Sequence, residues 1–277
     1  MIGLLDIDSK YPNVALMKLK AYYGDQARMI TPLEAWSCDK VYISSIFNFS
    51  YKPNLPAEHT IYGGTGYDIK AKLPSEIEQC QPDYSIYPLA EVAMQRYSTG
   101  CIRKCPFCVV YEKEGGITSS NPMNIPDNSK WIYLLDNNFF ASPNWLESIQ
   151  HLIAYKKPVS FEGIDVRILN EEHCSWLAKV KNRKQFHIAW DNPKDNLVEK
   201  IRTMTKYINP SRIGCYVLIG YWSTPDEDLY RVEKLRELKI DPFVMPFDKN
   251  DAYQKKFARW VNHKAIWKTI KWENYKK

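Results

Sequence analysis

The feature that most constrains the fold is a regular alternation of short β-rich runs and amphipathic helical runs that begins near residue 91. Such a rhythm predicts βα units, in which parallel strands are joined by helical crossovers. The expected strands number six, too few for a complete eight-fold barrel, so we expect an α/β fold with a partial (β/α)6 barrel. Functional residues should then lie at the carboxyl ends of the strands. The strand-like runs are residues 91–98, 130–135, 159–164, 185–190, 212–220 and 240–246.

Helix starts between these strands are indicated by a capping side chain that stands directly before a proline. One of them is strengthened by a capping box, because Glu227 follows Thr224 by three residues. We expect helices to begin at all three dipeptides. They are Ser142-Pro143, Asn192-Pro193 and Thr224-Pro225.

The region before residue 88 has a different pattern and predicts a small α/β lobe. A helical run, residues 13–23, follows the first of several strand-like runs, and a glycine-rich turn occupies residues 63–66. The strand-like runs are residues 2–7, 40–47 and 60–62. The expected domains are a lobe at residues 1–88, the barrel at 89–250 and a C-terminal helical extension at 251–277.

Composition and charge favour a globular protein with an ordinary surface. The chain has 277 residues, of which 45% are apolar, enough to fill a core of its own. Its net charge of +6 comes from 38 basic and 32 acidic residues, a mild excess that favours a phosphate-bearing partner only weakly. No apolar run approaches 18 residues and no basic leader opens the chain, so we expect a cytoplasmic protein with no membrane association.

The last segment combines basic residues with three tryptophans: Trp260, Trp267 and Trp272. Charge and exposed aromatic rings together would suit contact with nucleic acid. At helical spacing, however, such tryptophans are more often buried in a core, and we favour that interpretation.

Three of the seven cysteines stand within eight residues, with the spacing C-x3-C-x2-C. They are Cys101, Cys105 and Cys108, and they follow the first expected barrel strand. Their thiolates can bind three irons of a [4Fe–4S] cluster, for which the sequence supplies no fourth ligand nearby. Zinc is the weaker alternative, because no second C-x2-C or histidine pair follows.

The fourth iron allows two interpretations. A distant cysteine could complete the cluster and make it a closed redox centre, or the iron could stay open to a small chelating ligand. The remaining cysteines are Cys38, Cys80, Cys174 and Cys215.

The cysteine spacing, with Phe107 immediately before the third cysteine, resembles the radical SAM superfamily. The resemblance covers the βα units from about residue 91 to about residue 246. It implies that S-adenosylmethionine (SAM) chelates the open iron and is cleaved reductively to methionine and a 5′-deoxyadenosyl radical, which takes hydrogen from a substrate. It also implies an electron donor such as a flavodoxin or a ferredoxin.

Polar residues at the ends of later strands extend this resemblance. Asp136, Asn137 and Asn138 stand where many members carry Gly-Gly-Glu, and they are expected to accept hydrogen bonds from the SAM ammonium. Arg167 and Asp191 follow the next two expected strands and are further candidates for SAM contacts. For Arg167 a structural salt bridge with Asp165, Glu162 or Asp191 is an equal alternative.

Residues 39–44 and the later Tyr62-Gly63-Gly64 make the N-terminal lobe similar to a shortened, Rossmann-like cobalamin-binding domain. It lacks the Asp-x-His-x-x-Gly element that ligates cobalt, so we do not expect cobalamin. Nucleic acid or a nucleotide is the weakly favoured substrate. The alternative function is a non-catalytic iron–sulfur or zinc module that interacts with nucleic acid.

Overall fold

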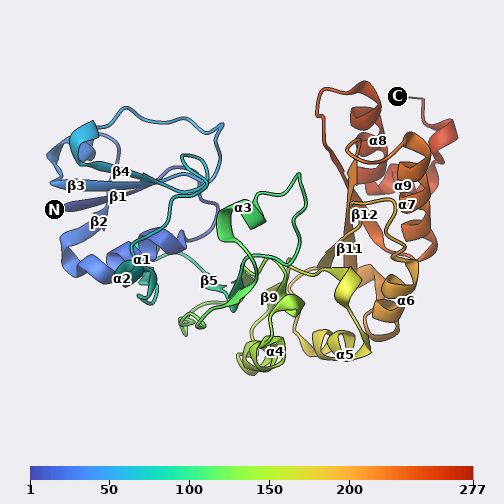
Figure 1. Ribbon diagram of the computed structural model, residues 1–277, viewed down its shortest axis with the longest axis horizontal. Helices are drawn as coiled ribbons and strands as arrows, with labels where there is room; N and C mark the ends of the chain where they lie inside the picture. The colour runs from blue at the N-terminus through green and yellow to red at the C-terminus, as the bar shows by residue number, and fades with distance from the viewer. Residues whose placement is uncertain (277) are drawn as a thin grey trace. The chain divides into compact units, whose positions relative to one another are not determined.

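The computed structural model describes residues 1–276 and has a mixed α/β fold with parallel sheets (Figure 1). The chain divides into two compact units, Met1–Leu135 and Asp136–Lys277. Within the described residues, no helix combines the length and the apolar character needed to span a membrane.

A four-stranded parallel sheet forms the centre of the first unit, in the order β2-β1-β3-β4. Its central strand, β1, has neighbours on both sides that come later in the chain, so the strand order reverses beside it. Ligands of open α/β sheets bind at the carboxyl ends of the strands near such a reversal. The strands are β1 (Ile2–Asp6), β2 (Ala27–Met29), β3 (Lys40–Ser44) and β4 (Thr60–Gly63).

Both faces of this sheet are covered, because its strands are apolar on both sides. Helices α1 (Val14–Tyr23) and α2 (Ser75–Glu78) lie on one face, where they pack against Leu4 and Tyr42 (Figure 1). On the other face Leu5 packs with residues of the connecting loops. Helix α1 begins where predicted, since the Asn13 side chain caps it by accepting hydrogen bonds from two backbone N–H groups.

The remainder of the first unit contains two short pairs of strands. Strand β5 (Val92–Gln95) pairs in parallel with β8 (Trp131–Leu134), and β6 (Ser98–Thr99) pairs antiparallel with β7 (Thr118–Ser119). The prediction of one strand over residues 91–98 is therefore wrong. The buried Gln95 side chain bonds both backbone groups of Met123 and also accepts from the Arg96 N–H, and β5 ends there.

The second unit contains the parallel sheet β10-β11-β12, formed by Phe186–Ala189, Ile213–Ile219 and Asp241–Pro246. The expected strand at residues 159–164 is shorter, because β9 is Val159–Ser160 and only a single bridge joins Ile164 to Ile188. Helices α7 and α8 pack against β11 and β12. The helices are α4 (Trp145–Ala154), α5 (Glu171–Lys179), α6 (Val198–Tyr207), α7 (Pro225–Glu237), α8 (Ala252–Asn262) and α9 (Lys264–Thr269).

One of the three predicted helix starts is confirmed and two are wrong. Thr224 caps α7 and forms the complete capping box with Glu227. At Ser142-Pro143 the chain makes a turn first, so that α4 starts after Asn144. At Asn192-Pro193 the Asn192 side chain accepts from the Lys194 N–H, which stabilises a turn in place of a helix.

Trp260 and Trp272 belong to an internal aromatic cluster, and Trp267 lies against the Arg236 guanidinium. The side chains of Trp260 and Trp267 are buried, and the Trp260 indole N–H donates to the Ile270 carbonyl at 3.0 Å. The ring centroids of Trp272 and Trp260 lie 5.3 Å apart. These rings stabilise the C-terminal helices.

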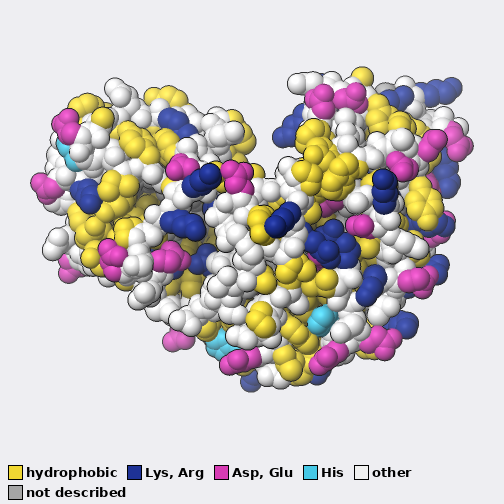
Figure 2. Space-filling view, in the orientation of Figure 1, with side chains coloured by type: hydrophobic (Ala, Val, Ile, Leu, Met, Phe, Trp, Pro, Cys, Tyr) yellow, Lys and Arg dark blue, Asp and Glu magenta, His cyan; other side chains and the backbone are white. Residues whose placement is uncertain are grey.

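Basic and acidic side chains are mixed on the visible face of each unit (Figure 2).

Candidate functional site

The three cysteines of the C-x3-C-x2-C motif lie on one loop of the first unit, between β6 and helix α3 (Val110–Glu114). Cys101 and Cys105 are half-buried and Cys108 is exposed, and all three carry reduced thiols. Phe107 is half-buried on the same loop. The sequence motif thus lies on a short segment that joins strand β6 to a helix.

Gly100 anchors the start of this loop. Its φ angle is +78°, and a Cβ at this position would lie 2.2 Å from the Gly116 carbonyl oxygen. The Gly100 N–H donates to the Glu114 carboxylate at 2.8 Å, and the Cys101 N–H donates to the Gly115 carbonyl at 3.2 Å. The segment before the first cysteine is therefore held against the end of α3, and only glycine fits there.

Backbone N–H groups also shape the environment of the sulfur atoms. The Cys108 N–H donates to the Cys105 carbonyl at 3.0 Å, which makes a tight turn between these two cysteines. The Arg103 N–H points at Cys101 Sγ, 3.4 Å away. Hydrogen bonds to sulfur tune iron–sulfur clusters, and three cysteine thiols are the donor type that three irons of a [4Fe–4S] cluster take.

Among residues 1–276, His, Cys, Asp and Glu side chains form no group of three or more that is placed to hold a metal ion. That finding concerns a single ion. In a [4Fe–4S] cluster each thiolate binds a different iron, so the ligands stand farther apart.

The predicted polar residues after β8 lie in the second unit, where they differ in exposure. The side chains of Asp136 and Asn138 are buried, whereas Asn137 is exposed. Gly163 packs directly against this turn, because a Cβ there would lie 1.9 Å from the Asp136 carbonyl oxygen, and its own carbonyl accepts from the Phe139 N–H at 3.0 Å. The turn is thereby fixed against the segment that follows β9.

Arg167 forms a structural salt bridge with Asp165, which is one of the alternatives given for it in the sequence analysis. Its Nε donates to Asp165 Oδ1 at 2.6 Å and its Nη2 to Asp165 Oδ2 at 3.2 Å, a bidentate arrangement. Asn138 Nδ2 donates to the same carboxylate at 3.3 Å, and Asp195 lies 3.5 Å from Arg167 Nη1. The structure therefore brings Arg167 and Asn138 together through Asp165.

Asp191 follows β10 and is positioned by a buried arginine. Arg231 Nη1 donates to the carbonyls of Trp190 and Asp191 at 2.7 and 3.0 Å, and its Nη2 pairs with Asp228 at 2.6 Å. Both Arg231 and Asp228 are fully buried. Burial raises the pKa of the Asp191 carboxyl, so this group holds a proton more strongly than an exposed aspartate does.

Sequence reasoning missed three residues that shape these strand ends. Gly163 stands within a predicted strand, where a glycine often marks a close approach of two backbones. Arg231 and Asp228 lie three residues apart on the apolar side of α7 beside Val232, and a charged pair on such a face indicates a buried ion pair. Both signals, the glycine within a strand and the charged pair on an apolar helix face, are visible in the sequence, but neither one alone indicates a functional site.

The candidate residues thus fall into two groups, each within one unit. Cys101, Cys105, Phe107 and Cys108 share a loop of the first unit. The second unit contains the strand-end residues Asp136, Asn137, Asn138, Arg167 and Asp191. No protein-family model matches the chain, and no curated protein matches it at a significant level.

Proposed function

We propose that the chain is a radical SAM enzyme whose βα units form a partial (β/α)6 barrel. The observation that carries the proposal is the cysteine loop: three reduced thiols within eight residues, fixed at Gly100 and followed by a helix. Three thiolates leave one iron of a [4Fe–4S] cluster open to another ligand. When bound, such a cluster supplies the electron that cleaves SAM reductively.

Each group of residues has a separate task in this proposal. Cys101, Cys105 and Cys108 would hold the cluster, and Phe107 would contact SAM. Asp136, Asn137 and Asn138 offer carboxylate and amide oxygens that suit the SAM ammonium.

Arg167 and Asp191 would make further contacts to SAM. Arg167 carries the planar guanidinium that suits a carboxylate, and its pair with Asp165 holds it in position. Nucleic acid or a nucleotide remains the proposed substrate, on the weak ground of the net charge of +6. A flavodoxin or a ferredoxin is the proposed electron donor.

Anaerobic reconstitution with iron and sulfide tests the cluster assignment. We expect about four irons per chain and, after reduction, an electron paramagnetic resonance spectrum that shifts when SAM is added. Cys101→Ser, Cys105→Ser or Cys108→Ser should lose the cluster. Cys80→Ser is the matched control, since Cys80 is also half-buried in the first unit. A cluster spectrum that does not respond to SAM, or the binding of zinc alone, would contradict the proposal.

A further inference from the structure

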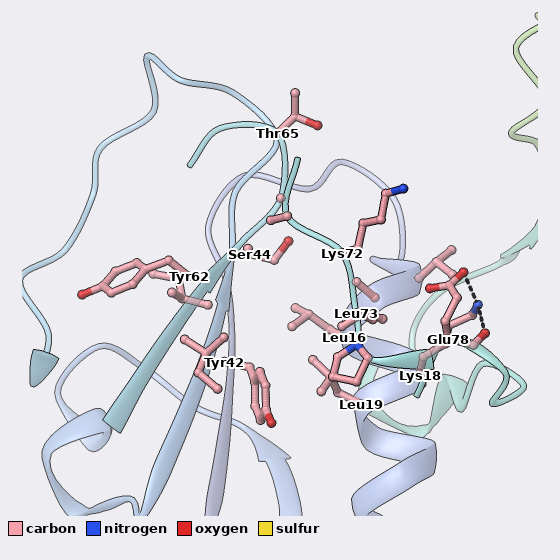
Figure 3. A pocket seen from close by; sticks show the side chains of 18 of the residues that line it. Leu16, Lys18, Leu19, Tyr42, Ser44, Tyr62, Thr65, Lys72, Leu73 and Glu78 are labelled. Carbon is pink, nitrogen blue, oxygen red and sulfur yellow. Dashed lines mark hydrogen bonds and ion pairs between the residues drawn. The ribbon is translucent and has the colours of Figure 1, made fainter. Parts of the chain in front are cut away.

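A pocket of about 540 Å³ lies beside the carboxyl ends of β3 and β4 in the first unit (Figure 3). Its walls come from α1, from these two strands and from residues 71–75, and none of its residues belongs to the proposed cluster ligands. Pockets of a few hundred Å³ that combine an apolar lining with a few polar groups are typical of small-molecule sites.

The pocket has an apolar end and a polar end. Figure 3 shows Tyr42 and Leu19 toward one end, and Thr65 and the Lys72 ammonium toward the other. Leu16 and Leu73 lie between the two ends of the pocket, next to its apolar end. A ligand that matches this lining has an apolar or flat body and a polar group on one side.

The charged side chains that line the pocket determine whether the polar group of the ligand is an anion or a cation. Four basic and two acidic side chains line the pocket, so positive charge is in excess, and both acidic side chains already accept hydrogen bonds. Glu78 pairs with Lys18 at 2.8 Å and with Arg96 at 3.0 Å. Glu114 accepts the Gly100 N–H at the start of the cysteine loop.

Two ammonium groups have no carboxylate partner among residues 1–276. Lys113 Nζ donates to the Thr65 hydroxyl at 2.9 Å, a neutral partner that leaves its charge uncompensated. Lys72 makes no hydrogen bond or ion pair with any residue that the structure describes. The polar end of the pocket is therefore cationic.

The turn beside Thr65 is preformed. Gly64 has a φ of +85°, and a Cβ at Gly64 or Gly66 would lie 2.3 Å or 2.5 Å from the carbonyl oxygens of Ser45 and Phe47. Packing against the end of β3 thus fixes the turn without a ligand, which reduces the entropy cost of binding.

We propose that this pocket binds a small phosphate monoester with an aromatic or aliphatic body. The phosphate lies between Lys72, Lys113 and the Thr65 hydroxyl, because a dianion matches two ammonium groups and a hydroxyl donor. The body contacts the apolar lining, which includes Leu16, Leu19, Tyr42 and Leu73. The proposal is independent of the radical SAM assignment, since binding requires neither the cluster nor SAM.

Isothermal titration of the full chain with 1-naphthyl phosphate tests the proposal. We expect this probe to bind at least about tenfold more tightly than inorganic phosphate, which lacks the body, and 1-naphthol, which lacks the charge. Lys72→Gln should weaken its binding by about three- to tenfold. Lys70→Gln is the matched control, because Lys70 is an exposed lysine two residues away that does not line the pocket.

A second variant examines the apolar end. Leu73→Ala should weaken the binding of 1-naphthyl phosphate and leave the binding of inorganic phosphate unchanged. Equal affinity in Lys72→Gln and Lys70→Gln, or equal affinity for 1-naphthyl phosphate and inorganic phosphate, would overturn the proposal. Lys72 is exposed, so its substitution should preserve the fold, and an unchanged melting temperature would verify this.

Discussion

Asp8 shows how one side chain fixes the carboxyl edge of the N-terminal sheet. Its carboxylate accepts hydrogen bonds from the Ser45 hydroxyl at 2.8 Å, the Ile46 N–H at 2.6 Å and the Phe47 N–H at 3.0 Å. Burial alone would raise the pKa of this carboxyl, but the hydrogen bonds outweigh burial and lower the pKa to about 2. The ionised form therefore holds the loop after β3 in place beside the pocket.

Replacing Asp8 by Asn should destabilise the protein in a pH-dependent way. Because the folded-state pKa lies below the ordinary value of 3.8, ionised Asp8 stabilises the native state above about pH 4, and this contribution disappears as the pH falls toward 2. We expect Asp8→Asn to lower the free energy of unfolding by on the order of 1–2 kcal/mol at pH 7.

Urea unfolding at several pH values measures this effect, with Asp25→Asn at an exposed carboxylate as the control. A stability difference between wild type and Asp8→Asn that stays constant from pH 7 to pH 2 would show that the carboxylate charge has no such role.

At the scale of the element, the cysteine loop depends on the backbone of Gly100. Alanine at this position should displace the loop, because its Cβ would collide with the Gly116 carbonyl and the φ of +78° disfavours any side chain. We expect Gly100→Ala to lose most of its iron after anaerobic reconstitution. Gly116→Ala is the control, since a Cβ there meets no atom within 4 Å. Equal iron content in the two variants would mean that the loop does not need this anchor.

The elements that the sequence predicted well are those with strong local signals. Thr224 caps its helix as expected and the helical run at residues 13–23 is confirmed, because both signals depend on residues within a few turns of one helix. Asn192 carries a similar signal but forms a turn instead, since Asn-Pro suits both structures. The local sequence pattern alone does not distinguish a helix start from a turn at this position.

Long-range contacts explain what the sequence could not predict. The break after Gln95 depends on Met123, and the short β9 is followed by Gly163, which packs against Asp136. The cysteine spacing was readable from the sequence, whereas its anchoring by Glu114 and Gly115 requires the folded loop. The cationic pocket combines residues from distant segments, such as Thr65 and Lys113, so no sequence window contains it.

At the scale of the whole molecule, the proposal assigns different tasks to the two units. The cysteine loop of the first unit would bind iron, and the strand-end residues of the second unit would contact SAM. Iron content can therefore be measured independently of SAM binding, whereas SAM binding depends on the open iron.

Reductive cleavage of SAM by the reconstituted protein is the decisive measurement for the radical SAM assignment. With dithionite as the reductant under anaerobic conditions, we expect the wild type to form 5′-deoxyadenosine and methionine in equal amounts. Cys101→Ser should form neither product, and Cys80→Ser should match the wild type. A wild-type protein that holds a complete [4Fe–4S] cluster and still produces no 5′-deoxyadenosine would contradict the radical SAM assignment.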